Sequence, residues 1–259
     1  MANIIGCYKW VFDEEDIKIN PADLSIDTSK AKSKISEYDR NAIGVAVNVG
    51  EERGDKVIAL TFGNAGAKQS LKDALSRGPA EAYWVNDSLA DTADGFVTAN
   101  VLAAAIKKIG DYSLIVCAEG AADTYAHQVG PRIGALLNIP VISCVNSIKL
   151  EGNQIMATRK LEDYVETVKA QLPVVISVLP EIMEAPIPGL KAVMNAGKKP
   201  NTEVKIAELG LDQNDLTPKA GSKDMRGYAS NRKNVLFTEG DAAVKVNELL
   251  ANLKKEGVL

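Results

Sequence analysis

Short apolar runs alternate with amphipathic segments over the first part of the chain. Five runs have the length and apolar content of buried strands: Ile4–Tyr8, Lys56–Phe62, Ala82–Val85, Ser113–Ala118 and Val141–Val145. Four intervening segments carry apolar residues at helical spacing: Ser36–Val49, Ala67–Arg77, Asp94–Ile109 and Tyr125–Leu137. Strands and helices that alternate in this way predict an α/β fold with a doubly wound, mostly parallel, Rossmann-like sheet.

The pattern changes after Val145 and predicts a small antiparallel extension of this sheet. Four short antiparallel strands are expected there: Ser147–Leu150, Gln154–Lys160, Val165–Lys169 and Val174–Leu179. A separate hairpin is expected near the N-terminus, within the polar segment Lys9–Lys34.

The last part of the chain reads as an arm followed by a helix. Pro186, Pro188, Gly189 and Pro200 interrupt residues 185–235, and much of this segment is polar. A long irregular stretch is unusual inside a compact domain, so we expect this arm to pack on another subunit. The apolar spacing in Gly240–Lys255 predicts an amphipathic helix. The expected divisions are an α/β domain over 1–184, a partner-recognition segment and arm over 185–235, and a C-terminal helix over 236–259.

Composition narrows the class of protein. The chain has 259 residues, 46% hydrophobic and 25% charged, and its net charge of −4 argues against a nucleic-acid-binding protein. No window approaches the roughly 20 apolar residues of a membrane span, and we expect neither a signal peptide nor membrane insertion. Cys7, Cys117 and Cys144 each lie in an apolar run, so buried, reduced and inert thiols in a cytoplasmic protein are expected.

The most informative candidate site lies in the run Leu114–Pro140. A buried strand leads into a loop of small residues, and Asp123 and Thr124 stand where the next helix is expected to begin. Backbone N–H groups at such a helix start point at an anion, and the usual anion there is a nucleotide phosphate. An ordinary N-cap without a ligand is the equally weighted alternative. Gln128 contacts ribose or phosphate in the first interpretation and faces solvent in the second.

Four segments are expected to meet at the carboxyl edge of the sheet: Cys7–Lys9, Ser36–Asp39, Phe62–Asn64 and Ala118–Thr124. The chain contains no G-x-G-x-x-G, G-x-S-x-G, H-E-x-x-H or P-loop lysine motif, and no Cys/His spacing typical of a metal site. Hydrolysis and phosphoryl transfer are therefore poorly supported. His127 is the only histidine, and a packing or surface role is favoured over a role as general base.

A second dense group of charges lies in the predicted extension and carries part of a family pattern. We expect Arg159, Glu162, Asp163 and Glu166 to pair across a hairpin rather than to catalyse a reaction. The pattern is Ala157-x-Arg159-x-x-Glu162-Asp163, followed by Glu166, Val168, Pro173 and Val175–Ile176. The nucleotide loop adds Asp123, Gln128, Val129, Gly130 and Pro131. Together these stretches resemble the electron transfer flavoprotein β subunit.

Other runs resemble one branch of that family. The start CYKWVFDEEDIKIN and the run KISEYDRNAI are similar to the FixA branch, including the caffeyl-CoA reductase-linked and carnitine-linked members. The run IPGLKAVMNAGKKP is similar to the segment that recognises partner dehydrogenases. Tyr164, Tyr125 and Ala126 depart from the patterns known in many members.

The resemblance implies that 1–184 is an adenine-nucleotide-binding domain without catalytic side chains. The implied cofactor-binding residues are Cys7, Tyr38, Asp39, Phe62, Ala118, Gly120, Asp123, Thr124, Ala126, Gln128 and Val129. Ordinary members hold AMP there as a structural ligand, whereas electron-bifurcating members hold a second FAD that takes a hydride from NADH. Similarity to the caffeyl-CoA reductase branch favours FAD. Tyr38 matches an aromatic residue that approaches the FAD of the α subunit.

The resemblance also implies partners. One is a flavin-binding α subunit, in an obligate heterodimer, and another is an acyl-CoA dehydrogenase-type flavoprotein that Ile187 and Leu190 would contact. Whether ferredoxin is a further partner stays open. The implied function is electron transfer between NADH or the dehydrogenase and a second acceptor. The alternatives are a subunit whose AMP is purely structural and a stand-alone nucleotide-binding stress protein, against which the long C-terminal segment argues.

Overall fold

The computed structural model describes residues 2–228 and 232–259, which form two compact units. The first unit contains the residues up to Lys18 together with Asp27–Asp224. The second contains Ile19–Ile26 and Met225–Leu259. Every residue proposed above for cofactor or dehydrogenase binding lies in the first unit.

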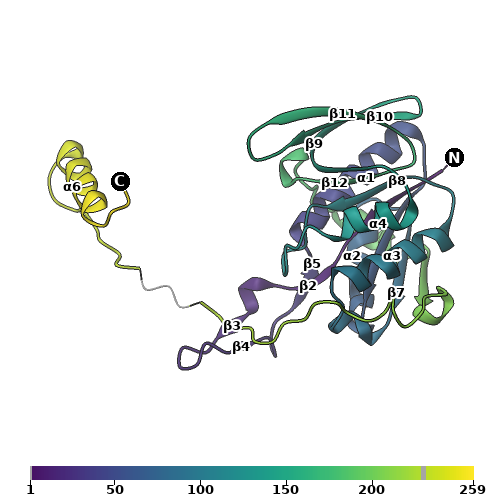
Figure 1. Cartoon of the computed structure of the whole chain (residues 1–259), viewed down its shortest axis with the longest axis horizontal. Coiled ribbons are helices and arrows are strands. Elements are labelled where there is room, and N and C mark those ends of the chain that lie inside the picture. Colours follow the sequence, from purple (N-terminus) through teal and green to yellow (C-terminus); the bar gives the residue numbers. More distant parts are fainter. Residues whose placement is uncertain (1, 229–231) are drawn as a thin grey trace. The chain divides into compact units, whose positions relative to one another are not determined.

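A nine-stranded sheet forms the centre of the first unit, in the order β11-β10-β9-β12-β8-β1-β6-β7-β13 (Figure 1). The parallel strands are β1 (Asn3–Cys7), β6 (Val57–Gly63), β7 (Glu81–Asn86), β8 (Tyr112–Ala118), β9 (Val141–Glu151), β12 (Val174–Val178) and β13 (Asn201–Lys205). β10 (Gln154–Lys160) and β11 (Val165–Gln171) continue the sheet antiparallel to β9. The predicted α/β fold with a mostly parallel sheet and an antiparallel extension is confirmed.

Helices cover both faces of this sheet. The helices of the first unit are α1 (Glu37–Arg53), α2 (Ser70–Ser76), α3 (Gly95–Ile109), α4 (Val129–Leu137) and α5 (Leu190–Ala196). Short 3-10 turns join several elements: η1 (Glu14–Asp16), η2 (Ala65–Gln69), η3 (Ser88–Asp91), η4 (Pro180–Ile182) and η5 (Ile206–Glu208).

Alternation along β1 shows how the two faces are filled. Ile4 packs with Ala42 and Ala46 of α1, whereas Ile5 and Cys7 belong to the apolar cluster of α3 and α4. Successive strand residues point to opposite faces, so one strand contributes to both cores. Burial on both faces is typical of a parallel sheet covered by crossover helices.

The polar N-terminal segment forms two small ribbons. β2 (Trp10–Phe12) pairs antiparallel with β5 (Ser33–Ile35), and β3 (Lys18–Ile19) pairs with β4 (Ile26–Asp27). The prediction of a hairpin within Lys9–Lys34 is confirmed.

Three sequence-based expectations are wrong. The helix expected from Tyr125 begins at Val129. The segment Val174–Leu179 is not an antiparallel strand, because β12 inserts between β8 and β9 and is parallel to both. Ser147–Leu150 is not a separate strand but the continuation of β9. The pattern also gave no indication of α5 or β13.

Residues 185–235 divide between the two units. Up to Asp224 they belong to the first unit, where α5 packs on α2 and β13 pairs with β7. Asp94 fixes a later part of the segment, since its Oδ2 accepts from the N–H groups of Lys219 and Ala220 at 2.7 and 2.9 Å. The rest lies in the second unit, and residues 229–231 are outside the described residues.

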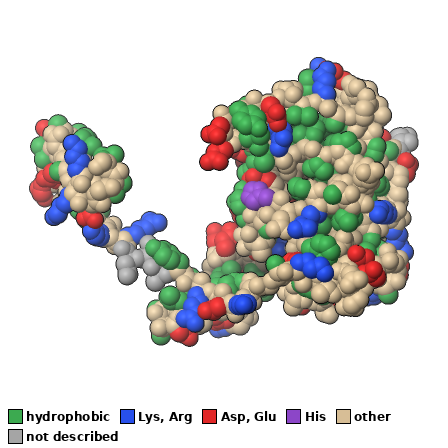
Figure 2. All heavy atoms as spheres, in the orientation of Figure 1, with side chains coloured by type: hydrophobic (Ala, Val, Ile, Leu, Met, Phe, Trp, Pro, Cys, Tyr) green, Lys and Arg blue, Asp and Glu red, His purple; other side chains and the backbone are tan. Residues whose placement is uncertain are grey.

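The second unit contains α6 (Ala242–Lys255), close to the predicted Gly240–Lys255. Asp241 caps the helix, with its Oδ1 accepting from Val244 N–H at 3.0 Å. Several apolar side chains of α6 are exposed: Val244, Val246, Leu249 and Leu250. Figure 2 shows hydrophobic side chains on the surface of this unit. Among the described residues, no helix has the length and apolar content to cross a membrane.

Candidate functional site

The candidate site lies at the carboxyl ends of β1 and β8. Chain connections run from β1 to β6 on one side and place β8 on the other side, so the strand order reverses here. In open α/β sheets this switch point is where ligands bind. The loop after β8, residues 119–128, and the start of α1 lie beside it.

Asp39 joins the start of α1 to the end of β1. Its Oδ2 accepts a hydrogen bond from the backbone N–H of Lys9 at 2.8 Å. The carboxyl group is buried, and this burial raises its pKa to about 7, although the Lys9 N–H and ammonium partly oppose the shift. An acid in this state titrates near neutral pH.

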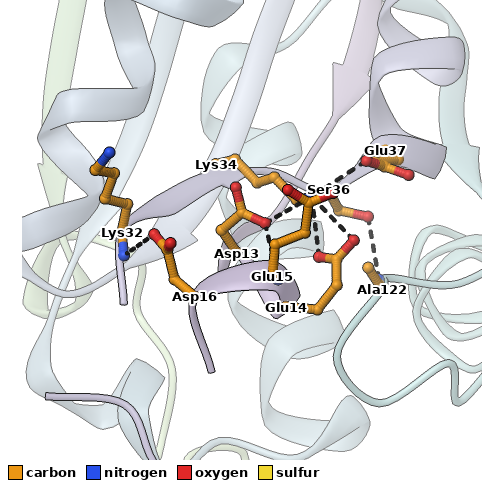
Figure 3. Close-up of polar contacts among 9 residues, drawn as sticks. All are labelled: Asp13, Glu14, Glu15, Asp16, Lys32, Lys34, Ser36, Glu37 and Ala122. Atoms are coloured by element: carbon orange, nitrogen blue, oxygen red, sulfur yellow. Dashed lines mark hydrogen bonds and ion pairs between the residues drawn. The ribbon is translucent and has the colours of Figure 1, made fainter. Parts of the chain in front are cut away.

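Two contacts hold the loop after β8. The Ala122 N–H donates to Ser36 Oγ at 3.1 Å, as Figure 3 shows. Lys9 Nζ lies 2.5 Å from Asp123 Oδ2. The predicted convergence of Cys7–Lys9, Ser36–Asp39 and Ala118–Thr124 is therefore present.

Asp123 and Thr124 do not begin α4, which corrects the expectation from the sequence. Asp123 Oδ1 accepts from the N–H of Thr124 at 2.8 Å, while Oδ2 pairs with Lys9. A local hydrogen bond of this kind competes with helix formation, and the helix starts only at Val129.

An aromatic cluster covers this loop. The Tyr125 ring lies 5.1 Å from the Tyr38 ring and 4.3 Å from the His127 ring, between centroids. Tyr125 Oη also donates to Glu119 Oε1 at 2.5 Å, and this bond raises the pKa of the tyrosine. His127 therefore packs on an aromatic side chain, as the sequence favours.

The loop backbone requires close packing and unusual torsion angles. Tyr125 and His127 have φ values of 44° and 54°, which side chains other than glycine adopt rarely. A Cβ atom at Gly120 would lie 2.9 Å from the Tyr125 ring, so only glycine fits beneath it. Strained loop residues of this type often belong to ligand sites.

The N-terminus of α4 supplies free hydrogen-bond donors. Gln128 makes no side-chain cap, in contrast to Asp94 at α3 and Asp241 at α6. Among the described residues, no protein acceptor faces the N–H groups of Val129 and Gly130. The positive end of a helix with unpaired N–H groups suits a phosphate.

Other candidate residues form the floor of the site or lie elsewhere. Cys7 and Phe62 are buried in one apolar cluster. Ala118 ends β8, and the side chains of Thr124 and Ala126 are exposed. Ile187 and Leu190, 94% and 78% exposed, lie before and at the start of α5 and outside this group.

A lysine surrounded by carboxylates supports the same region and was not foreseen from the sequence. Lys34 Nζ lies within 3.1 Å of Asp13, Glu14 and Glu37 (Figure 3). Burial lowers the pKa of Lys34, but the three carboxylates outweigh it and raise that pKa above its ordinary value. The group joins the β2–β5 ribbon to the start of α1.

Two residues of the charged group in the extension pair across neighbouring strands. Arg159 and Glu166 are paired residues of β10 and β11, and their side chains form an ion pair at 2.9 Å. Arg159 also donates to the carbonyl and hydroxyl oxygens of Ser143 at 2.9 and 2.8 Å. The expected pairing across a hairpin is confirmed for these two residues.

Fold and site together define an α/β protein with an uncapped helix start, the candidate anion site, at the switch point of a parallel sheet. The chain matches the electron transfer flavoprotein domain over residues 10–209 and belongs to that family. Its function class is therefore electron transport. Family members in general bind flavin or AMP and typically form heterodimers.

Proposed function

We propose that this chain is the β-type subunit of an electron transfer flavoprotein of the FixA branch. It pairs with a flavin-binding α subunit and passes electrons between NADH or an acyl-CoA dehydrogenase and a second acceptor. The observation that carries the proposal is the uncapped start of α4 at the β1–β8 edge, inside a domain of this family.

The donor set at this edge fits a nucleotide. The N–H groups of Val129 and Gly130 have no protein acceptor among the described residues and can donate to a phosphate. Lys9 is partly neutralised by Asp123, so the main attraction comes from backbone dipoles. Such a site holds a nucleotide without a dedicated basic side chain.

We propose FAD as the ligand at this edge. FAD supplies hydride acceptance from NADH and single-electron transfer, which is why no catalytic side chain is needed. The residues of the chain bind and orient: α4 holds the phosphate end, and Tyr125 and His127 form an aromatic wall over the loop. Tyr38, which stacks on Tyr125, would approach the flavin of the α subunit.

The exposed apolar surfaces support two protein partners. The apolar side chains of α6 suit the interface with the α subunit, since they are exposed within their own unit. Ile187 and Leu190 suit the dehydrogenase, because large apolar side chains at this exposure are typical of docking sites. Ferredoxin would be a further electron acceptor only if the complex bifurcates electrons.

Cofactor analysis of the purified heterodimer tests the proposal. Nucleotides are released by denaturation and quantified as FAD and AMP per heterodimer. Two FAD and no AMP support the proposed function, whereas one FAD and one AMP establish the alternative of a structural AMP. A chain that is monomeric, folded and loaded with nucleotide by itself would contradict the subunit assignment.

A Gly120→Ala variant tests whether the nucleotide binds at the loop after β8. Its Cβ would displace the Tyr125 ring, so the nucleotide of this chain should be lost while the flavin of the α subunit stays bound. Gly152→Ala is the matched variant, because no atom lies within 4 Å of a Cβ built at Gly152, in the turn between β9 and β10. Gly152 has a φ of 62°, so only a small loss of stability and no loss of cofactor is expected there.

A further inference from the structure

Two of the three cysteines lie at the carboxyl ends of neighbouring strands: Cys7 is the last residue of β1, and Cys117 is the last but one of β8. β1 and β8 are parallel, and their register pairs Gly6 with Val116. The next residues along the two strands are Cys7 and Cys117. The cysteines are therefore direct neighbours across the centre of the sheet.

Both side chains point to the same face. Cys7 and Cys117 are members of the apolar cluster of α3 and α4, and each is 5% exposed. A Cβ at Gly130, in the first turn of α4, would lie 3.8 Å from the Cys117 sulfur. Both thiols therefore lie on the α3 and α4 side of the sheet, and Cys117 lies close to the start of α4.

The spacing of neighbouring strands allows the two sulfurs to bond. Adjacent strands lie about 4.8 Å apart, which is inside the range of roughly 4.4–6.8 Å between the Cα atoms of a disulfide. Cβ atoms of neighbouring strands are farther apart than the about 3.8 Å that a relaxed disulfide prefers. A bond formed here is therefore strained, and strained disulfides are reduced easily.

We propose that Cys7 and Cys117 form a reversible dithiol–disulfide pair that exchanges with small-molecule disulfides. One thiolate attacks the small disulfide, forms a mixed disulfide and releases one small thiol. The second cysteine then displaces the other small thiol and closes the Cys7–Cys117 bond. Two protein thiols are oxidised, and one small disulfide is reduced to two thiols.

The surroundings set the rate of this exchange. The hydrogen bond with Cys117 and burial raise the pKa of the Cys7 thiol, so little of it is thiolate at neutral pH. The negative charge of Asp39 also disfavours the thiolate. Exchange is slow at pH 7 and accelerates as the pH rises. Both thiols are only 5% exposed, so a small disulfide meets the pair only when the structure around it opens locally, which slows the exchange further.

The experiment uses the full chain with its co-purified partner in a series of glutathione redox buffers at pH 8. After an acid quench, the thiols of this chain are counted under denaturing conditions by alkylation and mass spectrometry. The expected count falls from three to one as the buffer becomes more oxidising and returns to three with excess glutathione. The three cysteines fall in separate tryptic peptides, ending at Lys9, Arg132 and Lys149, so the bond is assigned directly.

Cys144→Ala is the matched control, because Cys144 lies on β9 and outside the pair. Its thiol count should fall from two to zero, whereas Cys7→Ala and Cys117→Ala should keep both remaining thiols. Three thiols in the most oxidising buffer, a stable glutathione adduct without an internal bond, or a bond to Cys144 would overturn the proposal. Peptide assignment in the unmodified chain decides the matter even if an alanine variant does not fold. The thiol count and the cofactor count are separate measurements, so failure of this proposal and failure of the proposed function are distinguishable.

Discussion

The ammonium of Lys9 and the carboxylate of Asp123 form an ion pair, with Nζ 2.5 Å from Oδ2. Lys9 follows β1, and Asp123 lies in the loop that follows β8. One contact therefore ties together the two strand ends that flank the switch point. The backbone of Lys9 is fixed as well, by its hydrogen bond to Asp39.

We predict that breaking this pair weakens nucleotide binding modestly. Both side chains are more than a third exposed, and ion pairs of this kind contribute about 0.2–1 kcal/mol. Lys9→Gln and Asp123→Asn should each raise the dissociation constant for the nucleotide by about two- to five-fold. Equilibrium dialysis with FAD and with AMP measures the change. The double variant should be no weaker than the worse single variant, and fully additive losses would show that the two residues act separately.

Because of Asp39, the free energy of unfolding should decrease as the pH rises toward neutrality. Burial raises the pKa of its carboxyl from 3.8 to about 7, and Lys9 and Asp123 are the charged groups that face it. The folded chain therefore keeps a proton that the unfolded chain loses near pH 4. Unfolding releases this proton between about pH 4 and 7, so stability decreases across that window.

An Asp39→Asn variant has no carboxyl group at this position, so unfolding no longer releases this proton. Its stability at pH 7 relative to pH 4 should exceed that of the unmodified chain by about 2–4 kcal/mol, because the amide still accepts from Lys9 N–H and carries no charge. Urea unfolding at a series of pH values gives the comparison. Asp163→Asn, in an exposed turn, should leave the slope unchanged. Parallel pH profiles for Asp39→Asn and the unmodified chain would disprove the titration of Asp39.

Two glycines of α4 should respond in opposite directions to alanine. A Cβ at Gly130 meets Cys117 and Ser177 at 3.5 Å, an ordinary contact, whereas a Cβ at Gly134 would lie 2.0 Å from Val141 Cγ2. Gly130→Ala should stabilise the chain by about 0.5–1 kcal/mol through the lower entropy of the unfolded state. Gly134→Ala should destabilise it by about 1–3 kcal/mol through overpacking. Thermal unfolding of both variants measures the two signs.

The exposed residue before α5 should affect coupling and not cofactor content. Ile187 is 94% exposed, so Ile187→Ala removes almost no buried contact from this chain. We expect at least a several-fold lower rate of electron transfer with the dehydrogenase, since an apolar anchor can dominate a docking site. Val165→Ala, at an exposed apolar residue of β11, is the control. Equal rates for both variants would remove Ile187 as the anchor.

Most of the parallel sheet follows from the sequence because its strands are continuous apolar runs. β12 was placed wrongly, since it follows β11 in the chain and adjacent strands usually pair. Its five residues are all buried, and burial on both faces marks a central parallel strand. The run VVISV, which has no alternation of polar and apolar residues, is typical of such a strand.

The candidate site was predictable in its location and not in its details. Strand ends that meet at one edge follow from topology, which brought Cys7, Ser36, Asp39 and Asp123 together. The start of α4 was misplaced because Asp123 looks like an N-cap, yet it binds its own neighbour Thr124 and Lys9. The Tyr38–Tyr125 contact depends on a positive φ at Tyr125, which no sequence pattern indicates.

The late position of β12 has a consequence for biosynthesis. In a nascent chain that ends before Val174, β8 belongs to one sheet with β1, β6 and β7, and β9 belongs to another with β10 and β11. No strand made so far can join the two sheets. The edges of β8 and β9 stay unpaired until residues 174–178 have left the ribosome. Chains that terminate before this point therefore expose two open strand edges, which are the kind of surface that chaperones bind.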